Sequence, residues 1–102
     1  MSDAYGLHVR FEAQAGQGDA LAAILLEAAA GVQALEACRL YLVSRSPEDA
    51  DTVWVTEAWT DRAAHDASLE DPGAGELIGR AMPLLAGRPD ATELAPAGGK
   101  GL

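Results

Sequence analysis

The stretch that decides the fold runs from Thr52 to Leu69 and reads TVWVTEAWTDRAAHDASL. Its first nine residues alternate between two faces, which is typical of a β-strand. Glu57 and Trp59 share one face, whereas Trp54 lies on the other. The following Asp-Arg-Ala-Ala segment predicts a capped short helix that ends the stretch. Because both tryptophans and a mid-strand carboxylate gather here, we expect this stretch to form one wall of any site.

The rest of the chain shows the same two periodicities. Alternating apolar residues predict further strands, and leucine and alanine at spacings of three and four predict helices. The expected strands span 5–12, 37–46 and 90–95, and the expected helices span 19–32 and about 74–85. The acidic segment 47–51 has the composition of a hairpin turn. This order, β-α-β-β-α-β, predicts an α+β ferredoxin-like fold, with a four-stranded antiparallel sheet and helices on one face.

Two local details follow from the same patterns. We expect Asp19 or Gly18 to cap the first long helix. Strict alternation in the second strand places Tyr41 on one face, and Cys38 and Leu40 together on the other. The single cysteine cannot form an internal disulfide, which fits a reducing compartment and a small buried apolar side chain.

Length and charge exclude several classes of protein. A chain of 102 residues predicts one domain over 1–95 and a flexible C-terminal tail over 96–102. The formal net charge of −9 disfavours binding to nucleic acids and to anionic membranes. No apolar segment reaches the roughly 20 residues of a membrane span, and the N-terminus lacks a signal-peptide pattern. We therefore expect a cytoplasmic protein.

The sequence contains no motif for a cofactor or a metal. The segment Gly16-Gln-Gly18 lacks the third glycine of a dinucleotide fingerprint, and no acidic residue follows at the required distance. One cysteine and two distant histidines do not make a metal site. We therefore expect no cofactor.

The face of the predicted sheet that the helices leave open is half apolar. It carries His8, Arg10, Trp54 and leucines of the second strand. An uncovered, half-apolar sheet face is an association surface. Two such sheets packed face to face would form a dimeric α+β barrel, so we expect a homodimer through the open sheet face.

Over residues 5–95 the chain resembles the antibiotic biosynthesis monooxygenase domain family. The matching segments are YGLHVRF at 5–11, GQGDAL at 16–21, CRLY at 38–41, PEDAD at 47–51, EAW at 57–59 and AAH at 63–65. The resemblance implies a dimeric α+β barrel with a ligand pocket between the sheet and the helices of each protomer. Related domains include cofactor-free monooxygenases of polycyclic aromatics, quinol oxidases, haem-degrading enzymes and cyclases.

The chain departs from two branches of that family. Haem-degrading relatives use an asparagine, a tryptophan and a histidine at positions where this chain has Val9, Ser68 and approximately Ile78. This departure argues against haem binding. The chain contains no asparagine at all, so the asparagine–tryptophan pair of the aromatic-polyketide monooxygenases is also unmatched.

Five residues are candidates for a site. His65 is the candidate catalytic base, because the ordinary pKa of histidine permits proton transfer near neutrality. Trp59 is a candidate stacking wall for an aromatic substrate. Tyr41 and Ser68 are candidate hydrogen-bond donors to a phenol or quinone oxygen, and Arg80 is a candidate stabiliser of an oxyanion.

Each candidate also has a plainer structural interpretation. The tryptophans can be core and interface residues, and His65 can be a partly exposed helix residue. Glu57 needs a partner such as Arg10, Arg39 or solvent, because an unpaired buried charge is costly. A structural salt bridge is a plainer interpretation of this carboxylate than a role as general base.

The expected function is that of a cofactor-independent monooxygenase of a small quinol-like or polycyclic aromatic molecule. Such a substrate supplies the reducing electrons itself, so the protein needs only to abstract a proton and exclude water. Two alternatives stay open: a non-redox cyclase or isomerase on the same scaffold, and a ligand-binding dimer without catalysis.

Overall fold

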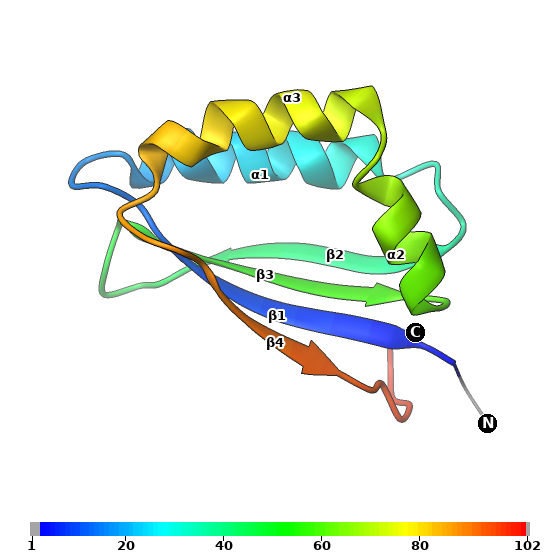
Figure 1. The fold of residues 1–102 in the computed structure, drawn as a ribbon. Coiled ribbons are helices and arrows are strands. Elements are labelled where there is room, and N and C mark those ends of the chain that lie inside the picture. Colours follow the sequence, from blue (N-terminus) through cyan, green and yellow to red (C-terminus); the bar gives the residue numbers. More distant parts are fainter. Residues whose placement is uncertain (1–2, 102) are drawn as a thin grey trace.

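The computed structural model describes residues 3–101, which form a four-stranded antiparallel sheet with helices on one face (Figure 1). The predicted α+β ferredoxin-like fold is confirmed. None of the helices in this range is long and apolar enough to cross a membrane. In chain order the elements are β1 (Tyr5–Glu12), α1 (Gly18–Gly31), β2 (Cys38–Arg45), β3 (Thr52–Trp59), α2 (Arg62–Ser68), α3 (Pro72–Ala81), the 3-10 helix η1 (Met82–Leu84) and β4 (Asp90–Leu94).

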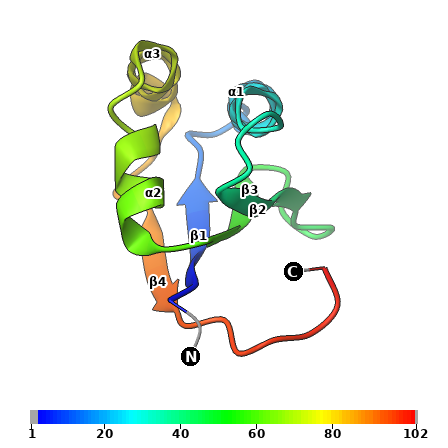
Figure 2. The same cartoon turned by 90° about the vertical axis from the view of Figure 1, so that its right-hand side faces the viewer.

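The sheet has the strand order β2-β3-β1-β4, which places β1 and β3 in the centre. These two strands pair over their whole length, from Tyr5 opposite Trp59 to Glu12 opposite Thr52. Helices α1 and α3 lie side by side above one face of the sheet, and α2 stands at one end of it (Figures 1 and 2). The layer between the sheet and these helices therefore holds both the core and the candidate site.

The most tightly packed core occupies the hairpin end of this layer. Leu21 and Leu25 of α1 pack there on Val53 and Val55 of β3, and Leu21 and Val53 are fully buried. Burial of such side chains stabilises a fold by about 1.5–3 kcal/mol each. Further along β3 the inward side chains are Glu57 and Trp59. The layer therefore becomes polar and aromatic toward α2.

The start of α1 is held by the hairpin and not by its own residues. The predicted cap at Asp19 or Gly18 is wrong: Gln17 holds the N-cap position and makes no side-chain capping bond. Instead the carboxylate of Asp51 accepts hydrogen bonds from the backbone nitrogens of Gly16 and Gly18, at 3.1 and 3.0 Å. A distant part of the chain thus satisfies the first N–H group of the helix, that of Gly18.

The predicted alternation of β2 fails at its first residues. A register irregularity between Cys38 and Leu40 makes Cys38 the partner of Trp59 and Leu40 the partner of Ala58. An extra residue of this kind shifts the side-chain alternation of a strand. Cys38 consequently lies on the same face as Trp59, which is the face covered by the helices.

Candidate functional site

Three side chains meet at the α2 end of the layer between the sheet and the helices, and we call them the Glu57 cluster: Glu57, Trp59 and His65. The indole Nε1 of Trp59 donates a hydrogen bond to Oε1 of Glu57 at 3.0 Å. Nε2 of His65 lies 3.9 Å from the same oxygen. The ring of His65 meets that of Trp59 edge-on, with 5.7 Å between centroids. Trp59 is 1% exposed and His65 is 8% exposed, so the cluster is almost closed to water.

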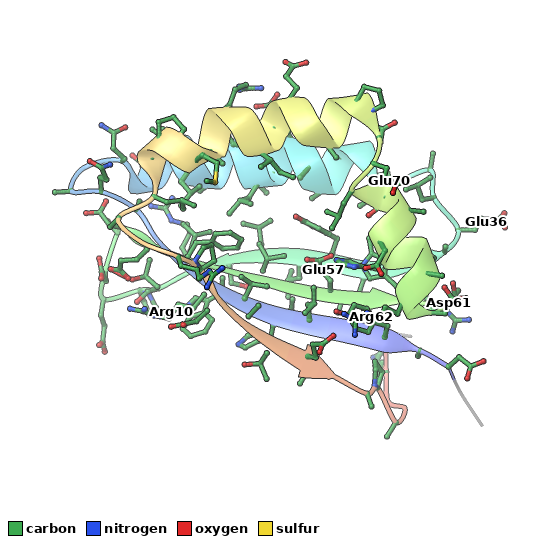
Figure 3. The ribbon with its side chains drawn as sticks, in the orientation of Figure 1. Arg10, Glu36, Glu57, Asp61, Arg62 and Glu70 are labelled. Atoms are coloured by element: carbon green, nitrogen blue, oxygen red, sulfur yellow. The ribbon has the colours of Figure 1, made fainter. Side chains whose placement is uncertain are left out.

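The local sequence explains this convergence. Glu57 and Trp59 are two residues apart on β3 and therefore point to the same face. Figure 3 shows Glu57 in the layer below the helices. Asp61 then caps α2, because its Oδ1 accepts a hydrogen bond from the backbone nitrogen of Ala64 at 2.7 Å. This cap starts the helix directly after the strand, so that the first helical turn carries His65 back over the end of β3.

The prediction of an arginine partner for Glu57 is wrong. Neither Arg10 nor Arg39 reaches it. Arg10 lies on the open face of the sheet and pairs with Glu12 at 2.8 Å. The carboxylate of Glu57 is satisfied by the indole of Trp59, with the imidazole of His65 nearby. A neutral donor offsets less of the cost of burying a charge than an arginine would.

The electrostatics of the site follow from its burial. Burial raises the pKa of Glu57, and the Trp59 hydrogen bond and the charge of His65 oppose this rise. Burial also raises the pKa of the Tyr41 hydroxyl and of the Cys38 thiol, and the nearby Glu57 carboxylate adds to both effects. Tyr41 is therefore a neutral hydrogen-bond donor at physiological pH.

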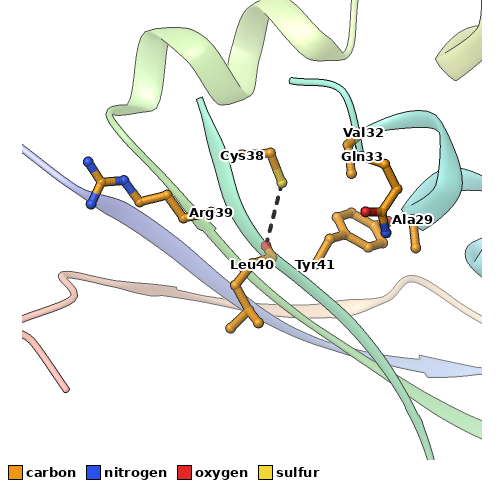
Figure 4. Close-up of a pocket in the computed structure, with 7 residues that line it drawn as sticks. All are labelled: Ala29, Val32, Gln33, Cys38, Arg39, Leu40 and Tyr41. Carbon is orange, nitrogen blue, oxygen red and sulfur yellow. Dashed lines mark hydrogen bonds between the residues drawn. The ribbon is translucent and has the colours of Figure 1, made fainter. Parts of the chain in front are cut away.

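A hollow of about 170 Å³ lies between α1 and β2 (Figure 4), and none of the residues that line it belongs to the Glu57 cluster. Two of its residues connect it to the cluster across the sheet: Tyr41 is the cross-strand partner of Glu57, and Cys38 is that of Trp59. On the helix side it is bordered by the small side chain of Ala29 and by the residues that follow α1. The residues that line it are Ala29, Val32, Gln33, Cys38, Arg39, Leu40 and Tyr41.

A second hollow, of about 510 Å³, is remote from these groups. It lies where η1 leads into β4, and it shares no residue with the Glu57 cluster. Its lining residues are Met82, Leu85, Ala86, Gly87, Arg88 and Pro89. Within residues 3–101, no three His, Cys, Asp or Glu side chains are grouped so that they could hold a metal ion.

The structure brings together three of the five residues predicted for the site. Trp59 and His65 are in contact, and Tyr41 lies on the strand beside them. Ser68 is turned away, because its hydroxyl donates to the backbone oxygen of His65 at 2.6 Å. Arg80 is engaged elsewhere by a double hydrogen bond to Glu27 of α1, at 3.2 and 2.8 Å.

Two neighbours of His65 were not anticipated. The ring of Tyr5 lies 5.1 Å from that of His65, and Oδ1 of Asp66 lies 3.0 Å from its Nδ1. Tyr5 faces the same way as Trp59 because the two are register partners in the central strand pair. The alternation of β1 determines only the face on which Tyr5 lies, whereas the register with β3 brings Tyr5 close to α2.

The opposite face of the sheet carries the other tryptophan. The rings of Trp54 and His8 stack at 5.0 Å, and Nδ1 of His8 lies 3.0 Å from the hydroxyl of Thr56. Leu42 and Leu94 on the outer strands are 51% and 42% exposed. The predicted separation of the two tryptophans is confirmed, and Trp59 is the one that faces the helices.

The sequence model of the antibiotic biosynthesis monooxygenase family matches residues 4–78. The chain belongs to this family. A comparison with curated protein sequences finds no match. A candidate antibiotic biosynthesis monooxygenase from Chloroflexus aurantiacus is 39% identical, with a TM-score of 0.86, and the similarity covers 96% of this chain and 97% of that one.

More distant members of the same fold are also similar. Rv0793 from Mycobacterium tuberculosis is 23% identical with a TM-score of 0.84, over 95% of this chain and 98% of that one. A variant of SnoaB, a cofactor-independent oxygenase from Streptomyces nogalater, is 15% identical with a TM-score of 0.82, over 97% and 98% of the two chains. At these identities the likeness shows the fold alone.

The raised pKa of Glu57 predicts a specific dependence of stability on pH. As the pH rises above about 4.5, the ordinary pKa of this side chain, the unfolded chain releases the proton before the folded chain does. The free energy of unfolding of the natural protein should therefore fall relative to that of Glu57→Gln between pH 4.5 and neutrality. Urea denaturation of both proteins at a series of pH values measures this difference.

Glu27→Gln is the matched control. The hydrogen bond from Arg80 lowers the pKa of Glu27, so its removal should give a pH trend of opposite sign or none. A difference between the natural protein and Glu57→Gln that stays constant with pH would contradict the assignment of Glu57 as a destabilised buried carboxylate.

Proposed function

We propose that the protein is a cofactor-independent monooxygenase of a small quinol-like aromatic molecule. The observation that supports this most is the Glu57 cluster: a buried histidine with one free ring nitrogen, one strand away from a hollow. Tyr41 and Cys38, which line that hollow, are the cross-strand partners of Glu57 and Trp59. Membership of the antibiotic biosynthesis monooxygenase family supports the same reaction class.

In the proposed reaction His65 is the base. Its Nε2 takes a phenolic proton from the quinol, and the resulting anion gives electrons to O₂. The quinol supplies four electrons in total and becomes a hydroxyquinone. One oxygen atom enters the ring as the new hydroxyl, and the other leaves as water, with protons that include the one held by His65. No further reductant is needed.

The other proposed roles are binding and exclusion of water. The Tyr41 hydroxyl, which burial keeps protonated, donates a hydrogen bond to the second oxygen of the quinol. Trp59 has a supporting role, because it is buried and holds the Glu57 carboxylate through its indole hydrogen bond. When His65 becomes protonated, that carboxylate lies 3.9 Å away and stabilises the imidazolium. We assign no role in this chemistry to Ser68 or Arg80.

The size of the hollow limits the substrate. Its volume of about 170 Å³ is close to the roughly 150 Å³ of an engineered cavity that binds benzene, and is smaller than the roughly 300–1,000 Å³ of sites for drug-sized ligands. A quinol of one or two rings fits this space better than a polycyclic molecule does. We therefore propose a naphthoquinol-sized substrate.

Removal of the base tests the proposed reaction. With a naphthoquinol, His65→Gln should consume O₂ at least about 100-fold more slowly than the natural protein, the usual effect of losing a general base. An oxygen electrode measures the rate, and ¹⁸O₂ labelling shows whether one oxygen atom enters the product.

Glu70→Gln, an exposed change just beyond α2, is the control and should leave the rate unchanged. Turnover that continues at full rate without O₂ would contradict the oxygenase proposal and favour a cyclase or isomerase. Full activity of His65→Gln would exclude His65 as the base.

We also propose that the protein forms a homodimer through the open sheet face. The half-exposed Leu42 and Leu94 flank the stacked pair of Trp54 and His8, so that an apolar strip crosses the face. Light scattering should give twice the chain mass of 10.5 kDa. Leu42→Glu should give the single-chain mass, because it would bury a charge in the interface. A single-chain mass for the natural protein would contradict the dimer.

A further inference from the structure

The contact between His65 and Asp66 determines which nitrogen of the imidazole can act as a base. Nδ1 of His65 lies 3.0 Å from Oδ1 of Asp66. An ionised carboxylate can only accept a hydrogen bond, so Nδ1 must carry the hydrogen. In the neutral ring the lone pair is then on Nε2. We infer that Asp66 is a positioning residue that holds His65 in the tautomer with a basic Nε2.

The surroundings of Nε2 agree with this assignment. Nε2 is 3.9 Å from Oε1 of Glu57, which is too long for a hydrogen bond, and that oxygen already accepts the indole N–H of Trp59. Nε2 is therefore free to accept a proton from a bound molecule. The other ring that faces His65 is that of Tyr5. The two carboxylates consequently have separate functions: Asp66 orients the neutral ring, and Glu57 stabilises the charged ring.

Asp66 is itself held in place by a chain of contacts outside the site. Nε of Arg62, one helical turn earlier, lies 3.8 Å from Oδ2 of Asp66. The same guanidinium binds Glu93 of β4 at 2.9 Å and lies over the ring of Tyr5, 5.4 Å from its centroid. The Tyr5 hydroxyl also donates to Glu93 at 2.8 Å. Figure 3 shows Arg62 near the start of α2, close to β1.

These outer contacts serve geometry more than stability. The side chain of Asp66 is 58% exposed and that of Arg62 is 65% exposed. Exposed ion pairs contribute little to stability. They place a positive charge beside the carboxylate that contacts His65. The inference rests on the proposed role of His65 as the base, but the tautomer itself can be measured without any turnover.

Asp66→Asn is the direct test. The Asn amide can donate a hydrogen to Nδ1, which would move the ring hydrogen to Nε2 and remove the basic atom from the site. Nitrogen-15 NMR of the histidine rings, at a pH where they are neutral, distinguishes the two tautomers, and His65→Gln assigns the signals. We expect the Nδ1–H form in the natural protein and a shift toward the Nε2–H form in Asp66→Asn.

The kinetic effect should match the spectroscopic one. In Asp66→Asn, kcat for quinol oxidation should fall on the order of 10-fold with little change in KM, because binding groups are untouched. Asp66→Ala should leave a mixture of tautomers, and Glu70→Gln should leave both the spectrum and kcat unchanged. An Nδ1–H form that persists in both Asp66 variants would overturn the inference. If the tautomer shifts in a protein that shows no oxygenase activity, the positioning role stands and the proposed reaction fails.

Discussion

The candidate site depends on the hydrogen bond from the Trp59 indole to the Glu57 carboxylate. A carboxylate on the inner face of a sheet, beneath two helices, is costly unless it is hydrogen-bonded. Trp59 supplies that bond from the same strand and at the same time fills the space around it. The core changes from aliphatic to polar at this pair. Helix α2, which follows the strand, positions His65 beside it.

Burial connects the chemistry of the neighbouring groups. It raises the pKa of Glu57, and it also raises those of Tyr41 and Cys38, whose charged forms would lie beside a carboxylate. The same burial would disfavour the phenolate anion of a bound quinol, unless a positively charged group forms beside it. In the proposed reaction, protonation of His65 would supply that cation, so that proton transfer and stabilisation of the anion would be a single event.

Much of this arrangement could be predicted from the sequence. Alternation in 52–59 placed Glu57 and Trp59 on one face and Trp54 on the other, and the order of the periodic segments predicted the ferredoxin-like fold. What could not be predicted depends on contacts between distant segments. The irregularity that turns Cys38 inward and the cap that Asp51 provides for α1 both arise from strand pairing and hairpin docking. The sequence also suggested an arginine for Glu57, although its partner was two residues away.

In the proposed function an aromatic ligand binds in the hollow between α1 and β2, one strand away from Trp59. The chain has two tryptophans, so Trp54→Phe leaves the fluorescence of Trp59 alone. Titration of this variant with a naphthoquinone, which resembles the proposed product, should quench the emission saturably and in competition with the quinol. Linear quenching without saturation, or saturable quenching only of Trp54 in a Trp59→Phe variant, would contradict the account.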